Sequence, residues 1–188
     1  IQRTIKNDNE VFNNNEKLII LDTYLNKCIH YYGFVRFLFA TGCRPEEVIA
    51  LEWSDIKDDG ISITKAYSRQ TLKSTKTGKN RIIPLNNTLI DILDNQPKVS
   101  SIIFPTTKGN YIDLSNFGVT SWKPLTTDLV QQGKIRRYLS VYHCRHTFIS
   151  ECLDKKIPVQ QIAKWVGNSP EIIYRNYAGI STEYEFPG

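Results

Sequence analysis

Apolar and polar positions between residues 16 and 51 recur with the period of an α-helix. One apolar stripe consists of Leu18, Ile19, Leu21, Leu25 and Ile29. It predicts a helix from Glu16 onward with one buried face. The segment 31–40 is apolar on nearly all sides and predicts a buried helix, and Gly42 follows it as a C-cap. Pro45 suits the first turn of a third helix, whose apolar residues are Val48, Ile49 and Leu51.

Two short segments in the middle of the chain have the composition of β-strands. They are 61–67, which follows the turn sequence DDG, and 81–85, which follows the turn sequence TGKN. We expect these segments to form a small antiparallel sheet. The connection between them carries Lys73, Lys76 and Lys79.

The rest of the chain predicts further helices joined by loops. We expect a helix over 88–93, an irregular connection over 97–112, a helix over 114–122 and a polar, basic loop over 131–140. A helical apolar stripe follows Tyr142, another helix begins at Pro158, and a last short helix comes after the break at 167–170. The pattern as a whole predicts a mostly α domain with a small antiparallel β-sheet, which is an α+β fold.

The start of the chain differs from the remainder. Residues 1–15 are polar and rich in Asn, so we expect a linker or a disordered start there. Residues 16–188 are enough for one compact domain with a sizeable core. The sequence contains no methionine, even at position 1, and we therefore expect a trimmed fragment that lacks an N-terminal part.

Composition narrows the function only a little. The formal net charge is +5 and the pI is about 9.0, a mild preference for polyanions that many ordinary domains share. No apolar run reaches the roughly 18 residues of a membrane span, and no signal peptide is recognisable. The four cysteines, Cys28, Cys43, Cys144 and Cys152, lack C-x-x-C spacing. We expect buried thiols in a reducing cytoplasm rather than zinc ligands.

Four sequence pieces carry a more specific signal. They are TGCRPEEVIALEWSDI, TKTGKNRIIPL, HCRHTF, and WVGNSP followed by six residues and a tyrosine. In this order they resemble the catalytic domain of the tyrosine recombinases, the phage integrase family. The resemblance covers roughly residues 18–180. It implies that residues 16–188 are a catalytic domain and that an N-terminal core-binding domain is absent from this fragment.

The resemblance assigns roles to individual residues. Arg44 matches the first catalytic arginine of the family, and Glu47 matches its acidic companion. Lys76 matches the lysine of the hairpin, and Arg145 matches the second arginine. His146 matches the histidine that usually follows this arginine. Tyr177, nine residues after Asn168, matches the nucleophile.

Two positions depart from the family pattern. A histidine is usual three residues before the second arginine, and this chain has Tyr142 there, followed by His143. Because one helical residue turns a side chain by about 100°, we place Tyr142 rather than His143 at the inward position. Asn168 stands where a second histidine or a tryptophan is usual. These departures concern proton transfer more than phosphate binding.

The resemblance implies a definite reaction. A tyrosine oxygen attacks a DNA phosphodiester, releases a 5′-hydroxyl and leaves a 3′-phosphotyrosine, without a nucleotide cofactor or a metal ion. Two guanidinium groups, of Arg44 and Arg145, would bind the phosphoryl oxygens. Lys76 is the expected general acid for the leaving oxygen. Asn168 can donate a hydrogen bond to a phosphate oxygen, and Tyr142 is a poor base at neutral pH.

Each assignment has an ordinary structural alternative. Arg44 could simply cap a helix or pair with Glu47, and Tyr174 is a rival nucleophile close to one helical turn from Tyr177. His146 could be a buried structural histidine or take part directly. Lys76 could be a surface charge, with Lys79 as the alternative general acid. Lys73, Lys79 and Arg81 are candidates for contact with DNA.

The sequence therefore favours a DNA integrase or recombinase of a bacterial or phage mobile element, acting in the cytoplasm on double-stranded DNA. Two other functions remain open, a catalytically inactive DNA-binding relative and a type IB topoisomerase. We expect a tetramer on paired DNA sites for a full-length protein and a monomer for this fragment.

Overall fold

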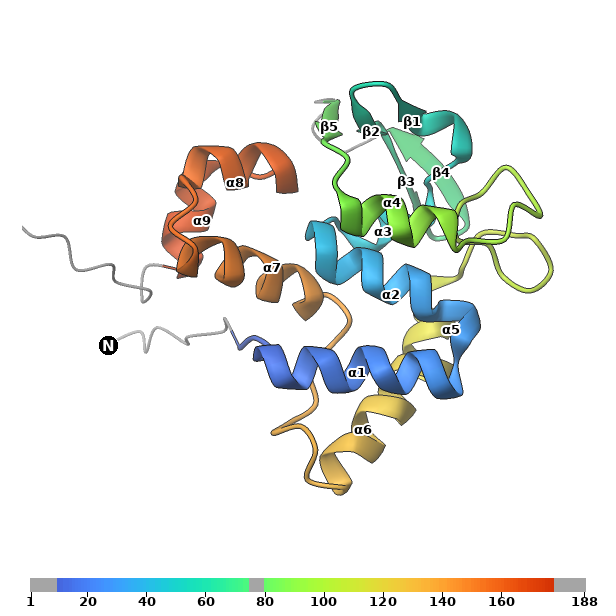
Figure 1. The fold of residues 1–188 in the computed structure, drawn as a ribbon, viewed down its shortest axis with the longest axis vertical. Helices are drawn as coiled ribbons and strands as arrows, with labels where there is room; N and C mark the ends of the chain where they lie inside the picture. The colour runs from blue at the N-terminus through green and yellow to red at the C-terminus, as the bar shows by residue number, and fades with distance from the viewer. Residues whose placement is uncertain (1–9, 75–79, 178–188) are drawn as a thin grey trace, which may run out of the picture.

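The computed structural model describes residues 10–74 and 80–177, and helical segments of all types make up slightly more than half of them (Figure 1). The helices of the N-terminal half are α1 (Asn14–Lys27), α2 (Ile29–Thr41), α3 (Pro45–Ile49) and α4 (Asn87–Asp94). The C-terminal half contains α5 (Leu114–Phe117), α6 (Lys123–Gln131), α7 (His143–Asp154), α8 (Val159–Val166) and α9 (Pro170–Tyr177). The predicted mostly α fold with a small antiparallel β component is confirmed. None of the helices in these ranges is long and apolar enough to cross a membrane.

Local sequence signals fix the ends of the first two helices. The Asn13 side chain accepts a hydrogen bond from the backbone N–H of Glu16, and the Glu16 carboxylate accepts one from the backbone N–H of Asn13. Helix α2 ends at Gly42, whose φ is +61°. A Cβ on Gly42 would lie 2.4 Å from the Phe148 ring. Glycine is therefore needed both for the helix end and for the close approach of α7.

The strands form two small antiparallel sheets instead of the single sheet that we expected. One sheet has the order β1-β2-β5 and consists of Ile56–Lys57, Gly60–Ile63 and Arg81–Ile83, with Ile61 opposite Ile83. The other pairs β3 (Lys65–Ser68) with β4 (Thr71–Ser74). The predicted strand 61–67 is thus wrong as one unit: it splits after Ile63, and its second half turns back on β4 instead of pairing with β5.

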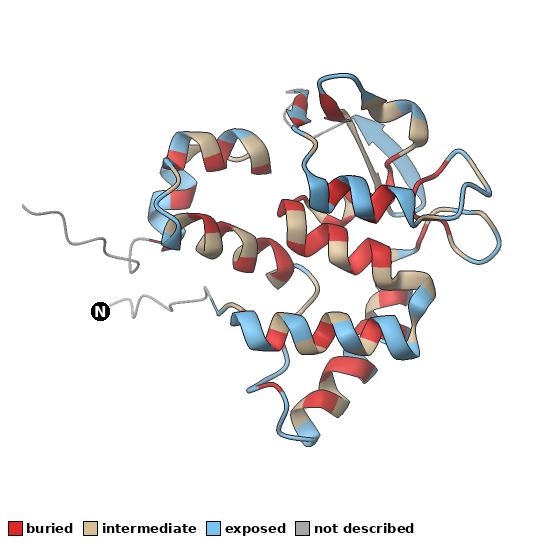
Figure 2. Cartoon of the chain, in the orientation of Figure 1, coloured by how far each residue is buried: buried red, intermediate tan, exposed pale blue. Residues whose placement is uncertain are grey.

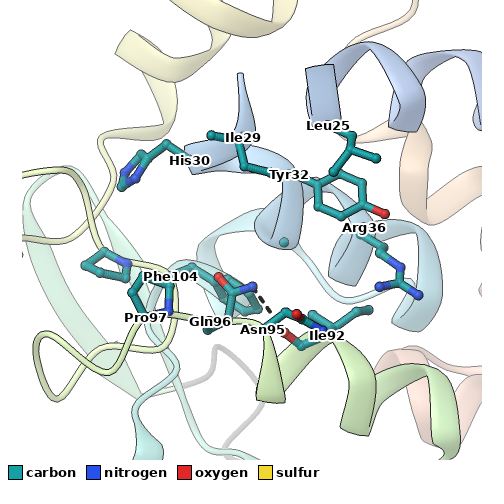
Figure 3. Close-up of a pocket in the computed structure, with 12 residues that line it drawn as sticks. Leu25, Ile29, His30, Tyr32, Arg36, Ile92, Asn95, Gln96, Pro97 and Phe104 are labelled. Carbon is teal, nitrogen blue, oxygen red and sulfur yellow. Dashed lines mark hydrogen bonds between the residues drawn. The ribbon is translucent and has the colours of Figure 1, made fainter. Parts of the chain in front are cut away.

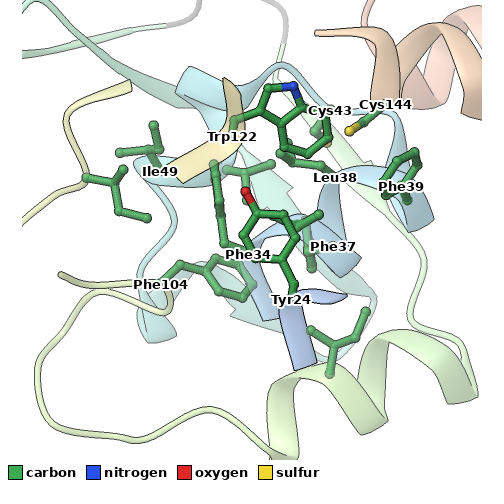
Figure 4. Packing of buried hydrophobic residues seen from close by; sticks show 14 of the residues in the cluster. Tyr24, Phe34, Phe37, Leu38, Phe39, Cys43, Ile49, Phe104, Trp122 and Cys144 are labelled. Atoms are coloured by element: carbon green, nitrogen blue, oxygen red, sulfur yellow. The ribbon is translucent and has the colours of Figure 1, made fainter. Parts of the chain in front are cut away.

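A large apolar core lies between α1, α2, α3 and the π-helical turn Gly118–Trp122 (Figures 2 and 4). Its largest side chains that are almost completely buried include Trp122, Tyr24, Phe34, Phe37 and Phe117. The Trp122 indole N–H donates to the Leu139 carbonyl at 2.8 Å, so this buried donor is satisfied. The core fixes α2, and with it the Gly42 end where α3 begins.

A second, smaller core is built by α7, α8 and α9. It consists of Ile149, Cys152, Val159, Ile162, Ala163, Val166, Ile173 and Tyr177. The three helices stand beside the larger body in Figure 1. The candidate nucleophile Tyr177 is therefore held by a packing unit separate from the main core.

The described part of the predicted N-terminal linker is ordered. Phe12 is 2% exposed and packs edge-on against Phe39 and Trp122. Its backbone N–H donates to the Thr147 hydroxyl at 3.1 Å. The expectation of a linker is therefore wrong from residue 10 onward, because Phe12 completes the main core; residues 1–9 lie outside the described residues.

Glu16 ties the start of α1 to the loop before α7. Burial would raise the pKa of its carboxyl, but hydrogen bonds from Arg136 and Asn13 outweigh burial and hold this pKa at about 2. The carboxylate receives the Arg136 backbone N–H and two guanidinium nitrogens at 2.8–3.0 Å.

We expect Glu16→Gln to lower the free energy of unfolding by about 1–3 kcal/mol at neutral pH, since it breaks a buried hydrogen-bond network. The stabilisation by Glu16 is complete above the unfolded carboxyl pKa of about 4.5 and is lost as pH falls toward about 2. Urea unfolding at a series of pH values measures this difference. Glu10→Gln is the control, because the Glu10–Arg137 pair is exposed and should contribute little. Equal pH dependence of the two variants would contradict the assignment.

Candidate active site

Three arginines meet the carboxyl end of α8. Arg81 Nε donates to the Trp165 carbonyl at 2.8 Å, and Arg145 Nη1 donates to the Val166 carbonyl at 2.7 Å. Arg44 donates from both terminal nitrogens to the Gly167 carbonyl at 3.3 Å. The last carbonyls of a helix lack intrahelical partners and carry partial negative charge, so they attract cations. The end of α8 thereby gathers residues 44, 81 and 145 from three distant parts of the sequence.

Arg44 stands at the N-cap of α3, where the chain leaves the Gly42 turn. Its side chain is 35% exposed and bonds through Nη1 to Glu47 Oε1 at 3.1 Å. Its backbone N–H donates to Glu47 Oε2 at 2.9 Å. The short helix therefore presents a guanidinium group that is oriented by Glu47 and still open to solvent.

Glu47 lies at the centre of this charged cluster and is 3% exposed. Burial favours the neutral acid, but hydrogen bonds and charge from Arg81, followed by Arg44, outweigh it and lower the pKa of Glu47. The carboxylate accepts from both terminal nitrogens of Arg81, at 3.1 Å and 2.5 Å. Glu47 thus pairs with arginines, as expected of an orienting residue, and is not available as a base.

Arg145 is held inside the protein by backbone carbonyls. Its residue exposure is 2%, and Nη1 donates to the carbonyls of Gly42 and Val166 at 2.8 Å and 2.7 Å. Within residues 10–74 and 80–177 its buried Nη2 has no hydrogen-bond partner. Burial, together with the charge of Arg44, lowers the pKa of the guanidinium. A buried donor without a partner is costly, so this nitrogen favours an added acceptor such as a phosphate oxygen.

Tyr177 and His146 form a close pair. Tyr177 Oη lies 2.5 Å from His146 Nδ1. Burial raises the pKa of the Tyr177 phenol, although the charge of Arg145 acts in the opposite direction. Burial, and then His143 and Arg145, lower the pKa of His146 to about 4. At neutral pH the imidazole is therefore uncharged, and its Nδ1 can accept the phenol hydrogen.

The two positions that depart from the family pattern lie around this pair. The Tyr142 ring meets the His146 ring edge-on, with centroids 5.5 Å apart, but 38% of Tyr142 is exposed. His143 turns its Nδ1 toward Ser140. The Tyr142 ring contacts His146, but Tyr142 is exposed whereas His143 is half-buried, so burial does not support the prediction that Tyr142 rather than His143 lies inward. Asn168 Oδ1 accepts the backbone N–H of Ser169, which leaves its amide nitrogen free of any partner among the described residues.

The residues that we expected to contact DNA differ in their exposure. Lys76 and Lys79 lie outside the described residues. Lys73 is exposed on β4 and is accessible to a ligand. Arg81 is buried and bonded to Glu47 and the Trp165 carbonyl, so direct contact with DNA does not fit its position. The alternation of a short strand explains the error, because Arg81 and Ile83 share the inward face of β5.

Two cavities lie outside this cluster. One, of about 490 Å³, opens between α1, α2 and α4, and its lining includes Leu25, Tyr32, Arg36 and Phe104 (Figure 3). A second, of about 400 Å³, borders the cluster through residues such as Thr41, Ile83 and Trp165, and its lining includes none of the candidate catalytic residues. Among the described residues no group of three His, Cys, Asp or Glu could hold a metal ion.

Known proteins show similarity both in sequence and in structure. Tyrosine recombinase XerD of Staphylococcus haemolyticus is 27% identical over 156 residues, which cover 78% of this chain and 49% of that protein. A probable integrase/recombinase of Methanocaldococcus jannaschii is 22% identical over 164 residues, covering 81% of this chain and 47% of its own. The chain therefore spans about half the length of these curated relatives.

Solved structures share the fold at low sequence identity. The Tn1549 transposon integrase bound to circular intermediate DNA has a TM-score of 0.79 and 14% identity, covering 94% of this chain and 63% of its own. A lambda integrase tetramer bound to a Holliday junction has a TM-score of 0.62 and 15% identity, covering 85% and 47%. The family model for the phage integrase family matches residues 10–183. With this match, the arrangement of the helices and the order of the four sequence pieces, the chain belongs to the phage integrase family of tyrosine recombinases.

Proposed function

We propose that this chain carries out site-specific DNA strand exchange through a 3′-phosphotyrosine at Tyr177. The observation that carries the proposal is the buried Arg145 guanidinium, whose Nη2 lacks an acceptor among the described residues while Nη1 is fixed by two carbonyls. The positive charge of Arg44 lowers the pKa of Arg145, and the charge of Arg145 acts to lower the pKa of Tyr177. The three side chains therefore lie near one another. One phosphate between these groups would satisfy the donor and face the nucleophile.

In the proposed reaction the Tyr177 oxygen attacks phosphorus and loses its proton to His146 Nδ1. The bond between phosphorus and the 5′-oxygen breaks, and the leaving oxygen takes a proton from Lys76. The phosphotyrosine keeps the ester bond, so attack by another 5′-hydroxyl reverses the step and joins a new strand. Arg44 and Arg145 hold the charge on the phosphoryl oxygens, and the proposal requires neither a metal ion nor a cofactor.

Asn168 and Tyr142, the two residues that depart from the family pattern, each have a role in the proposed reaction. The amide nitrogen of Asn168 can donate a hydrogen bond to a phosphate oxygen, because only its Oδ1 is engaged by Ser169. Tyr142 packs on His146 and can fix the orientation of the imidazole. His146 then supplies the base that neither of these residues can provide.

Tyr177 must become accessible to DNA, since it is 6% exposed in this structure. Helix α9 follows the turn 167–170, where Gly167 has a φ of +65°. The helix packs on the small core of α7–α9 and not on the main core. We propose that α9 shifts on this turn when DNA occupies the arginines. Relatives with the same fold are solved on DNA, one of them as a tetramer on a Holliday junction, and we propose paired DNA sites as the substrate of this protein too.

Because the target sequence is unknown, the test uses a pool of nicked duplexes of randomised sequence. The nick lets a short 5′-hydroxyl strand diffuse away, so that the covalent product accumulates. We expect a denaturation-resistant protein–DNA product with the unmodified protein, and complete loss of this product with Tyr177→Phe. Tyr174→Phe is the matched control, because Tyr174 lies on the same helix and is 55% exposed. Mass spectrometry of the product locates the modified peptide.

Other outcomes would change the assignment. A product that depends on Tyr174 instead would move the nucleophile by one turn of α9. Salt-dependent DNA binding without any covalent product would indicate a non-catalytic DNA-binding protein. Relaxation of a supercoiled plasmid that lacks the selected sequence would indicate a type IB topoisomerase.

A further inference from the structure

We propose that Arg81 is a positioning residue of the active site, which locks the carboxyl end of α8 to the carboxylate that orients Arg44. The proposal rests on the proposed function, because it concerns the geometry of the same phosphate-binding groups. It replaces the expectation that Arg81 touches DNA.

The contacts of Arg81 join three elements. Arg81 is the first residue of β5. Its Nε donates to the Trp165 carbonyl on α8 at 2.8 Å, and both of its terminal nitrogens donate to Glu47 on α3. Nη2 also approaches Cys43 Sγ at 3.5 Å. Every nitrogen of the guanidinium group therefore has an acceptor inside the protein, and its side chain is only 7% exposed.

The next link runs from Glu47 to the phosphate-binding arginine. Glu47 Oε1 accepts from both Arg81 Nη1 and Arg44 Nη1, each at 3.1 Å. Arg44 in turn donates to the Gly167 carbonyl, two residues after the carbonyl that Arg81 holds. A displacement of Arg81 would thus shift Glu47 and the end of α8 together, and Arg44 is bonded to both.

The packing around Gly167 shows how closely Arg81 controls this end of α8. A Cβ on Gly167 would lie 2.7 Å from Arg81 Nη1 and 3.0 Å from the central guanidinium carbon. The guanidinium group thus occupies the space that a side chain at residue 167 would need. A lysine carries its three donors on one nitrogen, so it cannot occupy the separate positions of Nε, Nη1 and Nη2 from which Arg81 reaches the Trp165 carbonyl and both Glu47 oxygens.

The test compares Arg81→Lys with the unmodified protein on a duplex selected for covalent capture. We expect the single-turnover rate of covalent product formation to fall about 100-fold, because small displacements of catalytic groups have effects of this size. The affinity for DNA should change less than about twofold, since Arg81 is buried away from solvent. Gly167→Ala places a methyl group against the Arg81 guanidinium and so disturbs the same contact from the α8 side. It should also slow the reaction without weakening DNA binding.

A control variant distinguishes a positioning role of Arg81 from a general loss of stability. Glu16→Gln breaks another buried carboxylate–arginine pair, which is built on the loop before α7. At a temperature where all variants are folded, equal rates for Arg81→Lys and Glu16→Gln would overturn the proposal. The proposal would be overturned in favour of direct phosphate contact if Arg81→Lys bound DNA more weakly and the slope of log affinity against log salt concentration fell by about one.

Amide hydrogen exchange provides a readout that does not depend on catalysis. The peptide that spans the end of α8 and the turn into α9 should exchange faster in Arg81→Lys than in Glu16→Gln. If the unmodified protein forms no covalent product, the proposed function fails while this measurement still judges the anchoring of α8. If the product forms and both rate and exchange are unchanged in Arg81→Lys, only the positioning role of Arg81 fails.

Discussion

Arg145→Lys is expected to reduce covalent product formation by about 10³-fold, the effect of removing one well-placed donor to transition-state charge. The ammonium group of lysine could still bond to the carbonyls of Gly42 and Val166, which Arg145 Nη1 now holds. It could not at the same time reach the position of Nη2, which has no acceptor within the described residues. The substitution therefore keeps the charge and removes the donor that we propose binds the phosphate.

An anion-binding measurement checks this interpretation without DNA. Inorganic sulfate should raise the thermal midpoint of the unmodified protein more than sodium chloride of equal ionic strength does, since it binds the folded state. The difference should disappear in Arg145→Lys and persist in Lys73→Gln, a substitution of an exposed lysine on β4. An identical response of Arg145→Lys and the unmodified protein would show that Nη2 does not bind the anion.

His146→Gln is expected to slow covalent product formation by about 10²–10⁴-fold, the range of a lost general base. The half-buried imidazole has a pKa of about 4, so it is neutral and able to accept the Tyr177 proton at all higher pH values. The rate of the unmodified protein should consequently fall as pH drops through about 4. This acid limb should be absent from the residual activity of His146→Gln.

The matched control for this prediction is His143→Gln. His143 lies close to His146, with ring centroids 5.3 Å apart, but its Nδ1 faces Ser140 and not Tyr177. Its replacement should leave the rate within about threefold, since it has no place in the proton transfer. If both substitutions had the same effect, His146 would be a packing residue of α7 and the base would have to be sought elsewhere.

The folded-state pKa of His146 also affects stability. Because this pKa lies below the unfolded value of 6.5, the unfolded state binds the proton more readily between about pH 6.5 and pH 4. The stability of the protein therefore falls as pH decreases through this window. Rate measurements at acid pH need a check that the protein remains folded.

The sequence predicted most of the helices because their signals are local, but it missed α6 (Lys123–Gln131), which follows the predicted helix 114–122 without a break. Gly42 at the end of α2, Pro45 at the start of α3 and the apolar stripe of α7 each act within a few residues. The strand pattern was less informative, since residues 61–67 look continuous and only tertiary pairing decides that β3 joins β4. Phe12 was missed for a similar reason: one aromatic residue in a polar segment gives no periodicity, yet it fills the main core.

In the candidate site, too, sequence motifs identify individual side chains but not the tertiary contacts that hold them. The family motifs do not show that the guanidinium groups of Arg44, Arg81 and Arg145 are held by the carbonyls of residues 165–167. Backbone carbonyls have no sequence signature. The inward position of Arg81 could have been read from the alternation of β5, where it shares a face with Ile83.

The arginine contacts to α8 have a consequence for protein engineering. All three guanidinium groups bind main-chain oxygens of this helix, so the bond survives a change of side chain at residues 165 and 166. The side chains of Trp165 and Val166 must still fit the small core, and Gly167 is constrained in addition by its φ of +65° and by the Arg81 guanidinium. A chimaera in which a homologue donates its last two helices should therefore dock in the correct place, provided that the graft retains glycine at this junction.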